Sequence, residues 1–169
     1  MPRCLALLHP IHTQVRGSSA GSALHSARQA LRLRHPELIG LREALIECNG
    51  TLCTTALEAS WMYTEAVDCL SELPAEVSVA GKLRRLSSVL ALLVAATKGR
   101  LKPDDGLSAD DLVPLLTLVL VTARVDDLDF EGFVLDEMLN DAVVAGKESY
   151  CACTLQVALG FLREVKVDD

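Results

Sequence analysis

The stretch Ser108-Ala-Asp-Asp-Leu-Val-Pro-Leu-Leu-Thr-Leu-Val-Leu-Val121 decides the fold, because its apolar residues leave almost no polar side. A helix that is apolar all round packs in the centre of a helical protein. We therefore expect a helix from Ser108 to about Arg124, buried in the middle of an all-α domain.

The start of this helix carries two adjacent carboxylates and an interior proline. With Ser108 as N-cap, Asp111 is the N3 residue and completes a capping box, a structural task that Asp110 does not have. Pro114 lacks the N–H that would bond the Asp110 carbonyl, which loosens the turn around Asp110. Two interpretations stay open. Asp110 is an exposed, ionised carboxylate presented by a rigid helix start, or both acids simply favour the positive end of the helix dipole.

Composition and periodicity extend the helical prediction to the rest of the chain. The 169 residues are 50% hydrophobic but 4% aromatic, which predicts one domain with an aliphatic core. We expect a layered bundle of about six or more helices, with no strand and with Trp61 and Tyr63 packing at its rim. Besides the central helix, periodicity predicts a linker over 16–22, helices over 23–34, 36–48, 51–73, 78–98, 129–140 and 154–165, and a loop over 146–150.

Charge limits the possible partners. The net charge of −7 argues against binding to nucleic acid or to an anionic membrane surface. Residues 1–50 contain six Arg and three Glu, whereas residues 101–150 contain three Lys or Arg and twelve Asp or Glu. This acidic half is either a solvated face or a surface for a partner with exposed Lys or Arg. No apolar run reaches the ~18 residues that span a bilayer, so we expect an intracellular protein without membrane insertion.

The residues of covalent and metal chemistry are poorly placed. All four histidines lie in the first 35 residues, and the chain has no glycine-rich phosphate loop and no His-Glu-x-x-His motif. The six cysteines include no Cys-x-x-Cys pair, and Cys151-x-Cys153 alone is a poor zinc clip. We expect reduced thiols, no metal site and no cofactor.

Two ordered blocks resemble a known family. The stretch from Ser108 to Ala123 resembles the helix of the vacuolar protein sorting 9 domain that typically has Ala-Asp-Asp/Glu-Leu/Phe-hydrophobic-Pro. Gly146-Lys-Glu-Ser-Tyr150-Cys-Ala-Cys-Thr resembles the family's Gly-Glu-x-Gly-Tyr-Tyr-hydrophobic-Thr block, and Gly81-Lys-Leu83 resembles an upstream Lys-Leu. The resemblance covers residues 78–165. We expect a helical exchange-factor-like domain over 36–169 and a poorly defined segment over 1–35.

This resemblance implies a guanine-nucleotide exchange factor for a Rab GTPase of the early-endosomal (Rab-five) subfamily, cytoplasmic and peripheral to early endosomes. Such a protein catalyses nucleotide exchange without covalent chemistry. Asp110 matches the family's acidic finger, which reaches the phosphate-binding loop of the GTPase and its lysine. Asp111, Pro114, Tyr150 and Cys153 match positions expected at the GTPase-binding surface.

The second block departs from the family at three positions. Ser149 stands for the glycine before the tyrosine, Cys151 for the second tyrosine, and Cys153 for the threonine. A thiol is a weaker hydrogen-bonding group than a hydroxyl. The alternative interpretation is therefore a helical Rab-binding or scaffold module of the same fold that lacks exchange activity.

Overall fold

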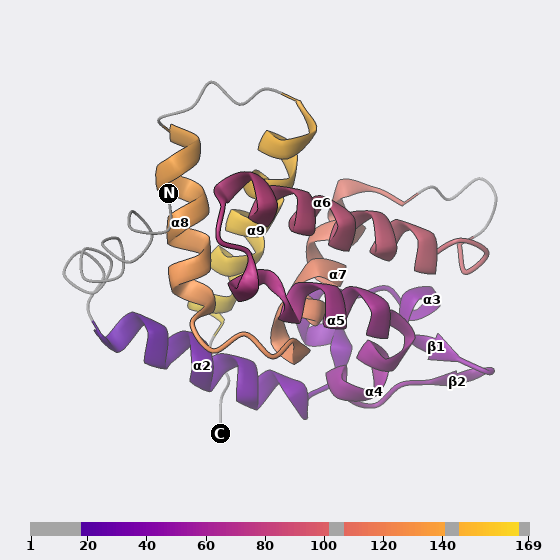
Figure 1. The fold of residues 1–169 in the computed structure, drawn as a ribbon. Helices are drawn as coiled ribbons and strands as arrows, with labels where there is room; N and C mark the ends of the chain where they lie inside the picture. Colours follow the sequence, from indigo (N-terminus) through magenta and orange to yellow (C-terminus); the bar gives the residue numbers. More distant parts are fainter. Residues whose placement is uncertain (1–17, 102–106, 141–145, 166–169) are drawn as a thin grey trace.

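The computed structural model describes residues 18–101, 107–140 and 146–165 and shows helices packed around one another (Figure 1). The predicted all-α class is confirmed, with a single exception of two short strands among the described residues. The longer helices are α2 (Ser18–Arg32), α5 (Thr64–Ser71), α6 (Val79–Ala96), α7 (Ala109–Thr122), α8 (Leu128–Asn140) and α9 (Lys147–Glu164). The shorter elements are η1 (Pro36–Ile39), α3 (Glu43–Ile46), β1 (Glu47–Cys48), β2 (Thr51–Leu52), α4 (Ala56–Ser60), η2 (Trp61–Tyr63) and η3 (Leu73–Ala75).

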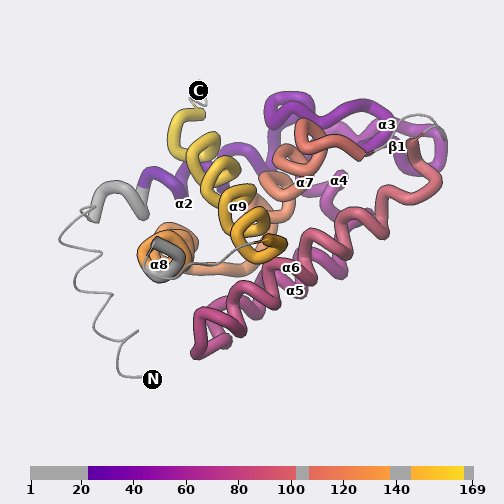
Figure 2. Tube along the Cα trace, turned by 90° about the horizontal axis from the view of Figure 1, so that it is seen from above, coloured from indigo at the N-terminus to yellow at the C-terminus, as the bar shows by residue number. Residues whose placement is uncertain are grey.

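Helix α7 is the buried centre that its sequence predicts. It contacts α2, α4, α5, α6 and α9, and Figure 2 shows α9 beside it. Every residue from Leu115 to Ala123 is buried. The two buried hydroxyls on α7 donate to carbonyls of the preceding turn, Thr117 to Val113 at 2.9 Å and Thr122 to Leu118 at 3.0 Å. These polar groups therefore enter the core without an unpaired donor.

The region between α2 and α6 differs most from the prediction. The single helices predicted over 36–48 and 51–73 are wrong, and short α and 3-10 pieces take their place. Gly40, with φ of 80°, ends η1 in a left-handed conformation that stops the helix. Asn49 and Gly50, with φ of 52° and 79°, form the tight turn of an antiparallel hairpin that pairs Glu47 with Leu52. The prediction of no strand is therefore also wrong.

Two helix starts lie earlier than predicted. Residues 18–22, predicted as a linker, are the first turn of α2. Residues 147–150, predicted as a loop, are the first turn of α9, in which Tyr150 N–H donates to the Gly146 carbonyl at 3.2 Å. Small and polar residues obscured both helix starts, because serine and glycine favour turns as well as caps.

A buried ion pair joins α6 to α8. Lys82 Nζ lies 2.7 Å from Glu131 Oε2 and also donates to the Leu73 carbonyl at 3.1 Å. Burial raises the pKa of Glu131, and the hydrogen bond and charge of Lys82 offset only part of that effect. Both charged groups thus have a partner in the interior, as buried charges require.

Candidate functional site

The candidate site lies where α7 and α9 begin. Figure 1 shows both helices starting on the upper side of the molecule and running downward beside each other, a packing that their contacts confirm. The first turn of α7 carries Asp110 and Asp111, and the first turn of α9 carries Tyr150. The fold therefore brings the two blocks, about forty residues apart in sequence, to one side of the protein.

The Asp111 carboxylate is bound by two residues, Ser108 and Arg42. Its carboxylate accepts hydrogen bonds from Ser108 N–H at 2.9 Å and from the Ser108 hydroxyl at 2.7 Å, which is the carboxylate half of a capping box. Arg42 makes a two-pronged contact with it, Nε to Oδ1 at 2.6 Å and a terminal nitrogen to Oδ2 at 2.8 Å. Burial alone would raise the pKa of Asp111, but the Ser108 hydrogen bonds and the Arg42 charge outweigh burial and lower it.

Asp110 has the opposite environment. Its side chain is exposed, and within the part of the chain that the structure describes it has no hydrogen-bond or ion-pair partner. The turn that carries it is fixed by the neighbouring Asp111 clamp. Asp110 lies in the first turn of α7, beside the positive end of the helix dipole. The result is a carboxylate with a defined position that points its charge to solvent.

Pro114 contributes to the same helix start. It is half-buried, and a Cβ built on Gly40 would lie 3.5 Å from Pro114 Cγ, so the chain around Gly40 lies close against this ring. Pro114 also has no N–H for the Asp110 carbonyl. Gly40 and Arg42, which the sequence did not point out as functional residues, therefore support the first turns of α7 from a distant segment.

The first turns of α9 present a row of exposed side chains. Tyr150 is 49% exposed, Cys153 is exposed, and Val157 is 53% exposed. Their spacing of three and four residues places them along one side of the helix. Ser149 is also exposed, whereas Cys151 is buried. Burial raises the pKa of the Cys151 thiol. A hydrogen bond with the Ser87 side chain offsets part of that rise.

The described part of the chain holds no candidate metal cluster and no candidate membrane-spanning helix. Residues 18–101, 107–140 and 146–165 contain no group of three or more His, Cys, Asp or Glu that could hold a metal ion. The same residues include no helix long and apolar enough to span a bilayer. Cys48, Cys53, Cys69, Cys151 and Cys153 are free thiols, and Cys4 lies outside the described residues.

The match to a family model agrees with this arrangement. The model of the Vacuolar sorting protein 9 (VPS9) domain matches residues 63–167, which include both helix starts. The chain therefore belongs to the VPS9 domain family, and the resemblance predicted from the two blocks is confirmed. As a family, VPS9 domains are guanine-nucleotide exchange factors for Rab GTPases.

A human relative matches part of the chain. The chain is 34% identical over 56 residues to the Homo sapiens protein "VPS9 domain-containing protein 1". The matched segment is 33% of this chain and 9% of that protein, so the chain spans a small part of the relative's length.

Proposed function

We propose that this protein is a guanine-nucleotide exchange factor for a Rab GTPase of the early-endosomal (Rab-five) subfamily, with Asp110 as its acidic finger. The observation that carries the proposal is the exposed Asp110 carboxylate at a clamped helix start within a VPS9 domain. The Rab-five specificity rests on the resemblance of the two sequence blocks. Action on such a GTPase would bring the protein from the cytoplasm to the surface of early endosomes.

The proposed mechanism is electrostatic. When the first turn of α7 enters the nucleotide site of the GTPase, the Asp110 carboxylate competes with the β-phosphate of GDP for the lysine of the phosphate-binding loop. The same negative charge repels the phosphate and the water shell of its Mg²⁺. No covalent bond forms or breaks on the exchange factor. GDP leaves because its phosphate loses its cation partners.

The remaining site residues have supporting roles in this proposal. Tyr150 and Cys153 contact the switch region of the GTPase along the exposed row of α9, to which we add Val157. Pro114 and the neighbouring Gly40 shape the side of α7 that receives the GTPase. Asp111 contributes to partner binding indirectly, because it is only 6% exposed. Its bonds to Arg42 and Ser108 fix the turn that carries Asp110.

The decisive experiment measures release of fluorescent GDP from a panel of Rab GTPases with purified protein. We expect acceleration for a Rab-five-type GTPase. Asp110→Ala should lower the accelerated rate by roughly 100-fold, the size of effect seen when a single transition-state electrostatic contact is removed. Its melting temperature should change little, because an exposed helix-dipole contact contributes ~0.3–1 kcal/mol.

Asp68→Ala is the matched control, since Asp68 is an exposed aspartate on α5 away from the site. It should exchange nucleotide as the wild type does. If no Rab in the panel responds to the wild type, or if Asp110→Ala exchanges at the wild-type rate, the proposed mechanism is wrong.

A second candidate is a Rab-binding or scaffold module without exchange activity. Two features of α9 favour it: Cys151, in place of a tyrosine, is buried and turned into the core, and Cys153 offers a thiol in place of a hydroxyl. This candidate predicts that the protein binds a Rab GTPase while GDP release stays at its uncatalysed rate.

A further inference from the structure

The single tryptophan of the chain is exposed to solvent. Trp61 is 70% exposed, and Leu57, a large apolar residue that lines the same hollow, is 40% exposed. An indole ring gains more than almost any other side chain from burial. The expected packing role holds for Tyr63, which is buried, and fails for Trp61. Packing in the core therefore does not explain the position of the Trp61 ring.

Trp61 is held in place and does not hang from a loose loop. The buried Tyr63 hydroxyl donates to the Leu45 carbonyl at 2.7 Å, which pins η2 to the core. The Thr64 hydroxyl donates to the Trp61 carbonyl at 2.8 Å, and the preceding α4 begins with a capping box between Thr55 and Glu58. Because Ala59, Ser60 and Tyr63 occupy the buried side of this segment, the indole faces outward.

Two hollows lie on either side of the indole. One, of about 410 Å³, lies between η2, the start of α5 and the end of α6, where Met62, Leu92 and Ala96 contribute apolar walls. The other, of about 160 Å³, lies between α4, α5 and the end of α7, with Leu57, Thr122 and Arg124 in its wall. Trp61 borders both and forms a ridge between them. A rigid aromatic ridge between two hollows is typical of the centre of a protein-binding surface.

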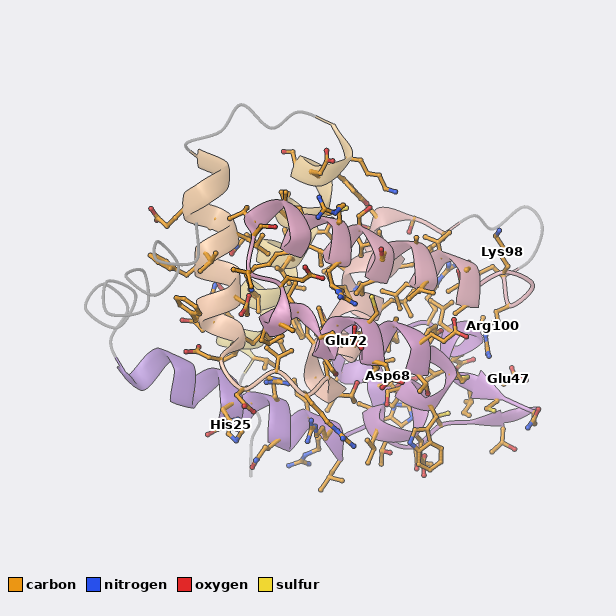
Figure 3. The ribbon with its side chains drawn as sticks, in the orientation of Figure 1. His25, Glu47, Asp68, Glu72, Lys98 and Arg100 are labelled. Carbon is orange, nitrogen blue, oxygen red and sulfur yellow. The ribbon has the colours of Figure 1, made fainter. Side chains whose placement is uncertain are left out.

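Two acidic residues and one basic residue line the hollows beside the ridge. Glu65 lines the larger hollow and Asp68 the smaller one, and both are exposed. Neither has an ion-pair partner among the described residues, whereas Glu72, the residue that follows α5, pairs with Arg85 at 2.5 Å. Figure 3 labels Asp68, on α5, and Glu72, just after the end of that helix. Arg124 also lines the smaller hollow, and the basic residues of a ligand would lie away from it, over Glu65 and Asp68.

We propose that this Trp61 surface, formed by Leu57, Trp61, Thr64, Glu65 and Asp68, binds a basic amphipathic segment of a partner protein. Two large apolar side chains of that segment straddle the indole and enter the two hollows. Its Lys or Arg residues pair with Glu65 and Asp68.

The Trp61 surface is separate from the candidate exchange site. The smaller hollow reaches Thr122 and Arg124 at the C-terminal end of α7, whereas Asp110 lies at the N-terminal end. A helix of 14 residues spans about 20 Å. The two surfaces therefore share no residue and lie at opposite ends of α7.

The test uses Trp61 itself as the reporter, because no other tryptophan contributes to the emission. The wild type is titrated with a synthetic amphipathic helix of Leu and Lys, and separately with the same peptide carrying Glu in place of Lys. We expect a saturable blue shift and reduced acrylamide quenching with the Lys peptide alone. The Glu65→Lys, Asp68→Lys double variant should weaken Kd by about tenfold, as expected for reversed charges at an interface.

The control variant Glu47→Lys, Glu137→Lys reverses two exposed acids elsewhere and should bind as the wild type does. Three outcomes would overturn the proposal: no blue shift with the Lys peptide, an equal response to the Glu peptide, or equal weakening by both double variants. Sedimentation equilibrium tests the other possible occupant of the Trp61 surface, a second copy of this chain. A dimer of this chain that forms in the absence of peptide and is abolished by Trp61→Ala would also overturn it.

Discussion

At the scale of single residues, the fold separates two neighbouring aspartates. Asp111 is 6% exposed and its carboxylate is bound by Ser108 and Arg42, whereas Asp110 is exposed and has no partner among the described residues. One carboxylate is thus used to fix the backbone, and the next remains available for a ligand. The arrangement relies on Arg42, whose two-pronged contact a lysine could not reproduce.

Asp111→Asn should reduce stability in a pH-dependent way. The pKa of Asp111 is lower in the folded protein than in the unfolded chain, where an aspartate titrates near pH ~3.9. Its contribution is therefore fully present above that pH and disappears as pH falls through the lower folded pKa. Urea unfolding at pH 7 should show a loss of about 1–3 kcal/mol, the cost of losing a buried charged hydrogen-bond acceptor.

At pH 3 the difference between Asp111→Asn and the wild type should shrink, because Asp111 of the unfolded chain then binds a proton more readily than Asp111 of the folded protein does. Glu43→Gln, a change of an exposed acid near Arg42, should show no such trend. A stability difference that stays constant from pH 7 to pH 3 would contradict the assigned ion pair.

Local chemistry made part of this site predictable. The cap, the acids and Pro114 lie within seven residues, so turn rules alone separate Asp110 from Asp111. Arg42 was missed because it lies 69 residues away from Asp111 in sequence and no local pattern connects them. The sequence also did not predict that Cys151 is buried and Cys153 exposed. The first turn of α9, which sets the side of the helix on which each one lies, was predicted as a loop.

At the scale of elements, α7 is held at its C-terminal end by arginines of α2. The buried Arg28 donates to the carbonyls of Leu120 at 2.8 Å, Val125 at 2.7 Å and Ala123 at 2.5 Å. Arg32 donates to the carbonyls of Val121 and Thr122 at 2.9 Å and 3.1 Å. These bonds satisfy carbonyls that a helix end leaves without a partner and favour the negative end of its dipole.

Arg28→Ala should lower the free energy of unfolding by about 2–3 kcal/mol, because three buried carbonyls lose a charged donor. Arg28→Lys should restore only part of this loss, since one ammonium cannot reproduce the planar fork of the guanidinium. Gln29→Ala, at an exposed position next along α2, should change stability by less than about 0.5 kcal/mol. Urea unfolding followed by circular dichroism measures all three, and an Arg28→Ala variant as stable as Gln29→Ala would refute the role.

Elements with strong periodicity were predictable, and short ones were not. The α6 and α7 predictions hold to within a few residues, because long apolar patterns fix a helix without outside help. Residues 36–73 contain enough Leu and Ala for helices. Gly40 and the Asn49–Gly50 turn adopt positive φ values that end a helix or reverse the chain. The pieces between them are stabilised by contacts with α6 and α7, which periodicity does not detect.

At the scale of the whole molecule, the described core extends beyond the family match. The VPS9 model matches residues 63–167, yet buried apolar side chains lie well before that point. They include Leu24, Leu31, Ile39, Leu41, Leu45 and Ile46, in one cluster with the residues of α7 and α9. The elements from α2 to α4 therefore belong to the same core as the matched region.

A fragment of residues 63–169 should fail to form the native structure. It would expose the α7 side that α2 and α4 cover and would lose Arg42 and Arg28 together. We expect far-UV circular dichroism to show some helix, but no cooperative thermal transition and strong binding of a hydrophobic dye. A fragment of residues 18–169 serves as the control and should melt cooperatively, and a cooperative transition in the shorter fragment would contradict this prediction.

The contacts of α2 also have a consequence for how the protein is made. Arg28 precedes the first carbonyl that it binds by 92 residues. At a synthesis rate of about 5–20 residues per second, α2 leaves the ribosome roughly 5–20 s before its partner does. Its apolar side, with Leu24 and Leu31, lacks its main native partners α7 and α9 during that interval. Nascent chains of this protein should therefore depend on a chaperone that shields α2 until α7 is complete.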